Sequence, residues 1–145
     1  MDPHGAAGPQ GILAICNSGV VYHNKDGTTN WSVIPEANFF QPGICCDVKV
    51  VFDPLSQRFF AIAQQGTGGN TNLYVNVSRS ANPASGSTND WMRYVFNTGI
   101  GNDYPGIGID GQALYVTYAF NQSWYVLNNA PASEGNPSPR ITPTE

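Results

Sequence analysis

Carboxylates around a glycine-rich stretch are the first candidates for chemistry in this sequence. Asp103 and Asp110 flank Tyr104-Pro105-Gly106-Ile107-Gly108, and a turn in that stretch would bring them together. Two carboxyl groups roughly 5 to 9 Å apart can cleave a glycosidic bond. In the structural alternative, which we favour, Asp103 caps a loop and Asp110-Gly111 forms a hairpin turn.

Arg58 is a second candidate, because an arginine can hold the carboxylate of a ligand. It follows the predicted turn Asp53-Pro54-Leu55-Ser56-Gln57. The alternative that we favour is an ion pair at the strand end with Asp53 or Asp47.

Aromatic residues form 12% of the chain, and Asn and Gln often stand near them. An aromatic ring can stack on the apolar face of a sugar while amides bond its hydroxyl groups. Most of these rings are expected in the core, but Tyr104 and Trp124 stand beside turns. The candidate ligand-binding residues are therefore Tyr104, Trp124, Arg58 and Asp103.

No complete catalytic constellation is visible, so we predict no catalytic residue and favour a protein that is not an enzyme. The sequence contains no Gly-x-Ser-x-Gly elbow, zinc-binding helix motif or phosphate-binding loop. Asn24-Lys25-Asp26 and Asn102-Asp103 offer oxygen ligands for Ca²⁺, but that ion needs six to eight. We therefore expect no cofactor.

The composition favours strands and turns and argues against two classes of partner. Charged residues form only 11% of the chain, while there are 16 Gly and 11 Pro. The 6 Lys and Arg are never adjacent, so the positive patch needed to bind nucleic acid is missing. No apolar run approaches the ~20 residues of a membrane span.

Short apolar runs bounded by Gly, Pro, Asn or Asp predict an all-β fold of about ten strands. The clearest runs are Ile12–Cys16, Val20–His23, Trp31–Ile34, Val48–Phe52, Arg58–Gln64, Leu73–Ser78, Trp91–Phe96, Ala113–Phe120 and Ser123–Leu127. A β-sandwich, a barrel and a β-propeller all fit this pattern.

A weak repeat favours propeller-like blades of antiparallel strands. Glycine-rich entries begin near Asp2, Gly43 and Asp103, about one four-stranded blade apart. Each entry is expected to cross near a central channel. Residues 1–128 are predicted to form one domain of about three blade-like units, and residues 129–145 a Pro/Ser-rich tail.

The order of several motifs resembles β-propeller domains of large secreted bacterial proteins over about residues 2 to 120. The motifs are Asp2-Pro3-x-Gly5-Ala6-x-Gly8-Pro9, Asn17-Ser18-Gly19, Asp47-x-x-Val50-x-Phe52-Asp53-Pro54, Val75-x-Val77-Ser78-x-Ser80-x-Asn82-Pro83 and Asp103-Tyr104-Pro105. The resemblance implies an architecture more than an activity. The members of that family continue into further blades.

A looser similarity connects the chain with sialidases and related exo-glycosidases, whose blades carry Asp-box turns. Asn24, Asp26 and Trp31 have the spacing of that box, although Gly27 comes one position early. We expect a structural role, in which Asp26 caps a hairpin and Trp31 packs between strands. A sialidase-like site would also need an arginine cluster, which these separated arginines do not supply by themselves.

These observations predict a non-catalytic binding or scaffold module for a glycan or a protein. The alternative is an exo-glycosidase fragment whose site further blades complete. The composition resembles exported proteins, so we expect an extracellular or periplasmic location, with a leader absent from this chain. Three blades would leave apolar faces open, which predicts a homo-oligomer. The three cysteines are expected either to be buried thiols or to include a bridge from Cys16 to Cys45 or Cys46.

Overall fold

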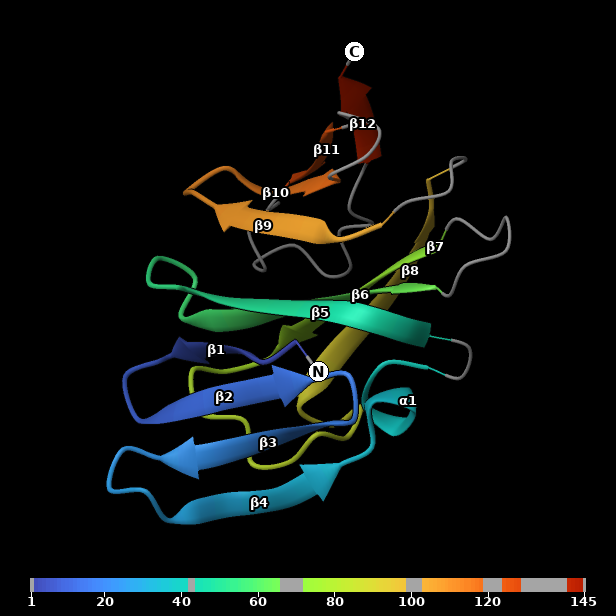
Figure 1. The fold of residues 1–145 in the computed structure, drawn as a ribbon. Coiled ribbons are helices and arrows are strands. Elements are labelled where there is room, and N and C mark those ends of the chain that lie inside the picture. Colours follow the sequence, from blue (N-terminus) through green and yellow to red (C-terminus); the bar gives the residue numbers. More distant parts are fainter. Residues whose placement is uncertain are drawn as a thin grey trace.

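The described part of the chain forms three four-stranded antiparallel sheets, each built from consecutive strands (Figure 1). The computed structural model describes residues 2–41, 44–65, 72–98, 103–118, 124–128 and 141–144. Within these ranges, the side chains of residues 44, 45, 124, 125, 127, 128 and 141–144 are not described. The predicted all-β, antiparallel character is confirmed.

Each sheet follows the order of its strands along the chain. Sheet 1 contains β1 (His4–Ala7), β2 (Gly11–Cys16), β3 (Gly19–Asn24) and β4 (Thr29–Ile34). Sheet 2 contains β5 (Ile44–Asp53), β6 (Arg58–Gln65), β7 (Asn72–Ser78) and β8 (Trp91–Asn97). Sheet 3 contains β9 (Pro105–Ile109), β10 (Ala113–Tyr118), β11 (Trp124–Asn128) and β12 (Ile141–Thr144). A single-turn helix, α1 (Glu36–Phe39), links sheets 1 and 2.

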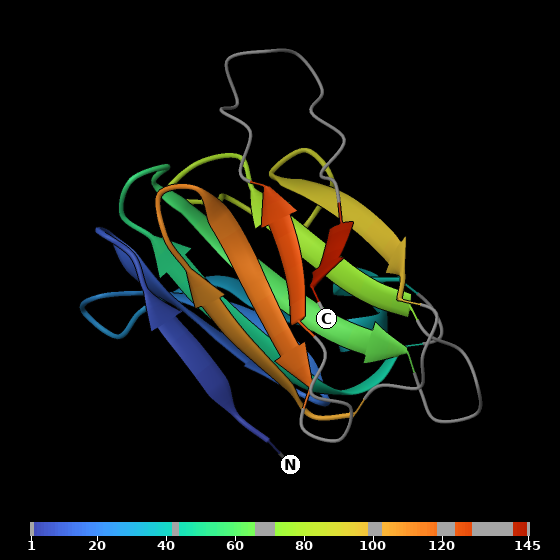
Figure 2. The same ribbon diagram turned by 90° about the horizontal axis from the view of Figure 1, so that it is seen from above.

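The first strands of the three sheets lie next to one another, since β1 contacts β5 and β5 contacts β9. Sheet 2 therefore lies between sheet 1 and sheet 3 (Figure 1), and seen from above sheet 3 covers sheet 2 (Figure 2). The turns β1–β2, β5–β6 and β9–β10 follow the same edge of the stack. They lie together on the left in Figure 1.

Sheet 2 is buried on both faces, which explains the uninterrupted apolar run in β6. Phe59, Ala61 and Ala63 pack into the cluster shared with sheet 1, whereas Phe60 and Ile62 pack into the cluster shared with sheet 3. Successive side chains of a strand point to opposite faces, so a strand covered on both sides needs apolar residues at every position.

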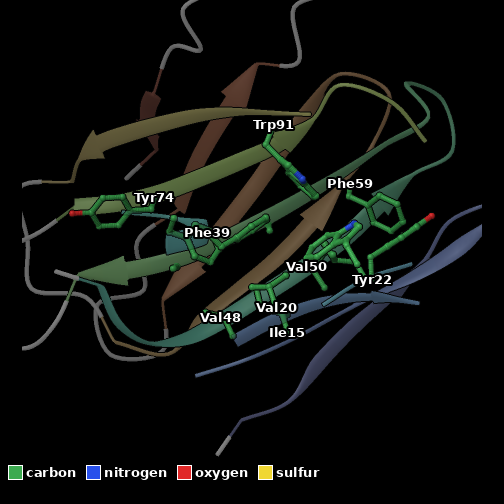
Figure 3. Close-up of a cluster of buried hydrophobic side chains, with 14 residues drawn as sticks. Ile15, Val20, Tyr22, Phe39, Val48, Val50, Phe59, Tyr74 and Trp91 are labelled. Carbon is green, nitrogen blue, oxygen red and sulfur yellow. The ribbon is translucent and has the colours of Figure 1, made fainter. Parts of the chain in front are cut away.

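The cluster between sheets 1 and 2 is rich in aromatic rings (Figure 3). Trp91 packs edge-on against Phe39 of α1, with ring centroids 4.8 Å apart. The amide of Asn76 in β7 donates to the backbone oxygen of Phe39 over 2.7 Å. α1 was not expected from the sequence; its last residue, Phe39, and the following Phe40 are fully buried in this cluster.

Three elements differ from the expectations. β1 and β9 are strands, although their segments were expected only to cross near a central channel. The strands were not expected because Gly5, Gly106 and Gly108 interrupt the alternation of apolar side chains. Within the predicted tail, Ile141–Thr144 forms β12, the edge strand of sheet 3. Cys46 is disulfide-bonded and Cys16 is a free thiol, which excludes a bridge from Cys16. The side chain of Cys45 lies outside the described residues.

The hairpin between β3 and β4 contains Asp26 and Trp31. The Asp26 carboxylate accepts hydrogen bonds from the backbone N–H and the hydroxyl of Thr28, over 2.9 and 2.6 Å. Gly27 follows with a φ of 88°, a conformation that favours glycine. The buried Trp31 ring stacks on Tyr22 at 6.1 Å, and its indole N–H donates to the Pro83 carbonyl.

We expect Trp31→Ala to lower the free energy of unfolding by about 3–5 kcal/mol, because it removes a buried aromatic side chain. Trp31→Phe keeps part of the packing and should cost less. Leu55→Ala is the matched control, since Leu55 is 72% exposed and its loss should change stability by under about 0.5 kcal/mol. Urea unfolding of the three variants measures these differences, and a Trp31→Ala loss below about 1 kcal/mol contradicts the core role.

Candidate functional site

Polar residues from all three sheets meet where the first strands begin. We call this region the entry end and define it by Asp2, Asn17, Glu36, Asp47, Lys49, Gln64, Asp103 and Tyr104. Asp2 and Asp103 lie just before β1 and β9, and Asp47 lies near the start of β5. Each of the three aspartates therefore lies near the start of the first strand of its sheet.

Gln64 connects sheet 2 to the segment that enters sheet 3. Its side-chain nitrogen donates to Asp47 Oδ2 over 2.8 Å and to Asp103 Oδ1 over 3.1 Å. Gln64 is only 2% exposed, and its Oε1 has no hydrogen-bond partner in the described part of the chain. An amide held by two carboxyl groups leaves this oxygen as an unused acceptor at the site.

Asn17, in the turn between β2 and β3, connects sheet 1 to the same group. Its side-chain oxygen accepts from the backbone N–H of Asp47 over 3.0 Å. Its nitrogen lies 3.5 Å from Asp2 Oδ2, a long hydrogen bond. Amide side chains from two sheets thus position the three aspartates.

The backbone is strained at two of these positions. Asp47 has a φ of 58° and Tyr104 a φ of 52°, in the left-handed region that non-glycine residues seldom adopt. An irregularity in the β5–β6 register surrounds Asp47. Such conformations are costly and gather at functional sites, and bulges there redirect side chains.

Burial is the main cause that raises the pKa of Asp47 above its ordinary value. A hydrogen bond with Asp103 and the negative charges of Asp103 and Asp2 raise it further, while Lys49 lowers it. Burial and the neighbouring negative charges therefore favour the protonated form of Asp47 more than in an exposed aspartate.

Glu36 is a second buried carboxyl group near Asp47. Burial, followed by the charge of Asp47, raises the pKa of Glu36 to about 7. Its Oε1 has no hydrogen-bond partner within the described ranges. Glu36 thus changes its charge near neutral pH.

Tyr104 provides the exposed aromatic surface of the entry end. The residue is 54% exposed, and the Lys49 ammonium lies 4.6 Å from its ring centroid. A cation against one side of the ring orients it. Tyr104 and Asp103, both predicted from the sequence, are therefore brought together here.

The other predicted residues lie elsewhere. Arg58 begins β6 opposite Asp53, at the far end of β5 from Asp47. Asp53 binds the backbone N–H groups of Leu55 and Ser56 and so caps the turn. The backbone of Trp124 begins β11, but its side chain lies outside the described residues.

The proposed Asp103–Asp110 carboxylate pair is wrong, because all of β9 separates the two residues. A strand rises ~3.3 Å per residue, which puts them much farther apart than glycosidic chemistry allows. Asp110 instead accepts from the backbone N–H groups of Gln112 and Ala113 and from the hydroxyl of Tyr115. It stabilises the β9–β10 turn, as the structural alternative proposed.

The arrangement suits recognition of hydroxyl groups better than hydrolysis or metal binding. Asp47 and Asp103 accept from the same Gln64 nitrogen, which holds the two carboxyl groups as neighbouring acceptors. In the described ranges, no three His, Cys, Asp or Glu side chains are arranged to hold a metal ion. The described helix is also far too short to span a membrane.

Sequence reasoning did not select Asp47, Gln64, Lys49 or Glu36 as ligand-binding residues. One signal was present, since an aspartate accompanies each glycine-rich entry. Gln64 also ends an apolar strand with a polar residue that is fully buried. Buried polar residues need partners, so they mark places where the chain must bring polar groups together.

We expect the melting temperature to fall between about pH 4.5 and 7. The pKa of Glu36 in the folded state, about 7, exceeds its value in the unfolded state. The protonated carboxyl group therefore stabilises the fold fully below about pH 4.3, and this stabilisation is lost as Glu36 ionises in the folded state. Glu36→Gln should flatten this slope. Asp26→Asn should keep it, because the pKa of the exposed Asp26 is lowered by hydrogen bonds to Thr28. An unchanged slope in Glu36→Gln, measured by thermal melts, rejects this assignment.

Comparison with models of protein families, with curated proteins and with solved structures found no match. The resemblance to secreted β-propeller domains and to Asp-box turns therefore stays a prediction.

Proposed function

We propose that this protein is a non-catalytic module that binds a glycan at its entry end, on three blade-like units of a β-propeller. The carrying observation is the juxtaposition of the exposed Tyr104 ring with the Asp47–Gln64–Asp103 group. A ring that stacks beside fixed donors and acceptors matches the alternating apolar faces and hydroxyl groups of a sugar.

The propeller assignment rests on the repeated architecture. Each sheet is a meander of four consecutive strands. The first strands of neighbouring sheets contact each other, β1 with β5 and β5 with β9. In a propeller, the first strands of successive blades surround a central axis. The aspartates near the starts of β1, β5 and β9 would then lie at one end of that axis, where a ligand meets several blades at once.

An extracellular or periplasmic location fits this proposal. Cys46 is disulfide-bonded, and disulfides persist mainly in oxidising compartments. The few charged and many uncharged polar residues agree with a function at such a surface. The negative net charge of −4 gives no support to a nucleic-acid partner.

The exo-glycosidase alternative has weaker support. Its acid–base pair would require two carboxyl groups that flank a glycosidic bond, whereas Asp47 and Asp103 both accept from the amide of the buried Gln64. Arg58 begins the strand at the opposite end from the aspartates, so it does not join them in holding a substrate carboxylate. A hydrolytic site would have to come from residues contributed by further blades.

We expect the whole chain to bind a subset of neutral glycans on an array and to release no sugar from them. Calorimetry with the best glycan should show binding about tenfold weaker for Tyr104→Asn, a loss of about 1.4 kcal/mol. Asparagine tolerates the left-handed backbone, so this variant removes the ring without adding strain. Leu55→Asn, which changes an exposed apolar residue in the β5–β6 turn, should bind like the wild type.

Three results contradict the proposal. The first is hydrolysis of the bound glycan by the wild type, which supports the glycosidase alternative. The second is equal affinity of Tyr104→Asn and wild type, which locates binding elsewhere. The third is an array without any bound glycan, which transfers support to a protein ligand.

A further inference from the structure

We infer that the disulfide bond of Cys46 controls the entry end, so that the site is ordered for its ligand only while this bond is intact. The inference rests on the proposed function, because it describes how the same site is regulated. It is carried by the place of Cys46 in the β5–β6 ladder and by its contact with Gln64.

Cys46 lies beside the polar group that is proposed to meet the ligand. It is paired with Gln64 in the register of β5 and β6, and the side-chain nitrogen of Gln64 lies 3.8 Å from its sulfur. The same nitrogen donates to Asp47 and to Asp103. One buried amide therefore contacts the disulfide-bonded sulfur and both carboxyl groups of the site.

The β5–β6 ladder does not fix Asp47 by itself. Its register is regular from Lys49 to Asp53, whereas the pairing shifts on both sides of Cys46. A bulge of this kind leaves residues without a partner in the ladder. The backbone of Asp47 has a φ of 58°, and such a conformation persists only where the surroundings hold it.

Two further restraints act on the backbone of Asp47. The side-chain oxygen of Asn17 accepts from its N–H over 3.0 Å. The second restraint is the covalent bond at the preceding residue, Cys46. A cross-link removes conformations that an open chain samples, so breaking it allows Asp47 to leave its costly conformation. Gln64 then loses a carboxyl group that orients its amide.

The switch works by thiol–disulfide exchange. Cys46 is half-buried, and exposed disulfides exchange more readily than buried ones. One sulfur of a dithiol attacks the protein disulfide, and its second sulfur then resolves the mixed disulfide. The dithiol becomes a cyclic disulfide, and two electrons and two protons pass to the two protein sulfurs. A disulfide-bearing oxidant reverses these steps and takes up the same electrons and protons.

This chemistry ties the site to a compartment. Thiols stay reduced in the cytosol, whereas disulfides persist in extracellular and periplasmic spaces. A chain in which Cys46 is reduced has a loose entry end and becomes able to bind when it reaches an oxidising compartment. Binding to sugars inside the cell that makes the protein is thereby avoided.

Hydrogen exchange tests this coupling without any glycan. The probe is the backbone amide of Asp47, which donates to Asn17, followed by NMR in the oxidised protein and after treatment with dithiothreitol. We expect its exchange to become at least about tenfold faster on reduction. The amides of Leu55 and Ser56, which donate to Asp53 at the other end of β5, are the matched control and should not change.

Two cysteine variants separate the disulfide from the free thiol. Cys46→Ser removes the bond and should show fast exchange at Asp47 without any reductant. Cys16→Ser removes the free thiol and should respond to dithiothreitol like the wild type. If Cys46→Ser does not fold, Cys16→Ser with and without dithiothreitol still decides.

Alkylation followed by mass spectrometry reports the redox state of each sample. The chain contains three cysteines, and Cys16 is a free thiol. One cysteine should therefore react in untreated wild type, and all three should react after reduction. Reaction of all three in untreated protein would show that the bond is absent and would overturn the inference.

Calorimetry then connects the bond with binding. The probe is the glycan that gives the strongest array signal, titrated into oxidised and reduced Cys16→Ser. We expect about tenfold weaker binding by the reduced form, while its far-ultraviolet circular dichroism stays unchanged. An array without any bound glycan counts against the proposed function, and hydrogen exchange at Asp47 then decides on the switch alone.

Three further results overturn the inference. The first is an Asp47 amide that exchanges equally fast in the oxidised and the reduced protein. The second is equal affinity of both forms for the glycan, which leaves the glycan proposal intact. The third is loss of the far-ultraviolet signal on reduction, because the bond would then support the whole fold and not the entry end in particular.

Discussion

Burial of both faces of sheet 2 is the constraint on which the rest of this structure depends. β6 alternates between two clusters, so sheets 1 and 3 each need an apolar face directed at it. Apolar burial contributes roughly 25 cal/mol per Å², and it is the dominant favourable term for a chain with so few charges. The positions of β1 and β9 beside β5 follow from that stacking, and the entry end exists because these three strands begin side by side.

The sequence was a good guide where a strand had to bury one or both faces. The runs around Leu13, Phe59, Val75 and Leu114 became strands because alternation and β-branched residues leave little choice. It was a poor guide at β1 and β9, whose glycines add no apolar side chain to the pattern. It also missed α1, because a four-residue helix has no periodicity to detect, and its place depends on how Phe39 fills the gap beside Trp91.

The candidate site could be predicted only in part, for a similar reason. Tyr104 and Asp103 stood out because they lie beside a turn. Gln64 and Asp47 look unremarkable in sequence, since their importance comes from long-range pairing across sheets. The Asp103–Asp110 pair failed because the glycines between them extend as a strand, where a turn had been expected. Long-range placement of polar groups follows from packing, which local patterns do not encode.

The composition of β6 has a further consequence during synthesis of the chain. Phe59–Ala63 contains neither charge nor proline, and one of its faces is covered by residues that the ribosome adds about 50 positions later, in β10. At ~5–20 residues per second, that face stays uncovered for several seconds on each nascent chain. Exposed segments of this kind pair readily with identical segments. The rate at which sheet 3 docks, more than the stability of the finished fold, would then limit how much of this protein a cell can produce in native form.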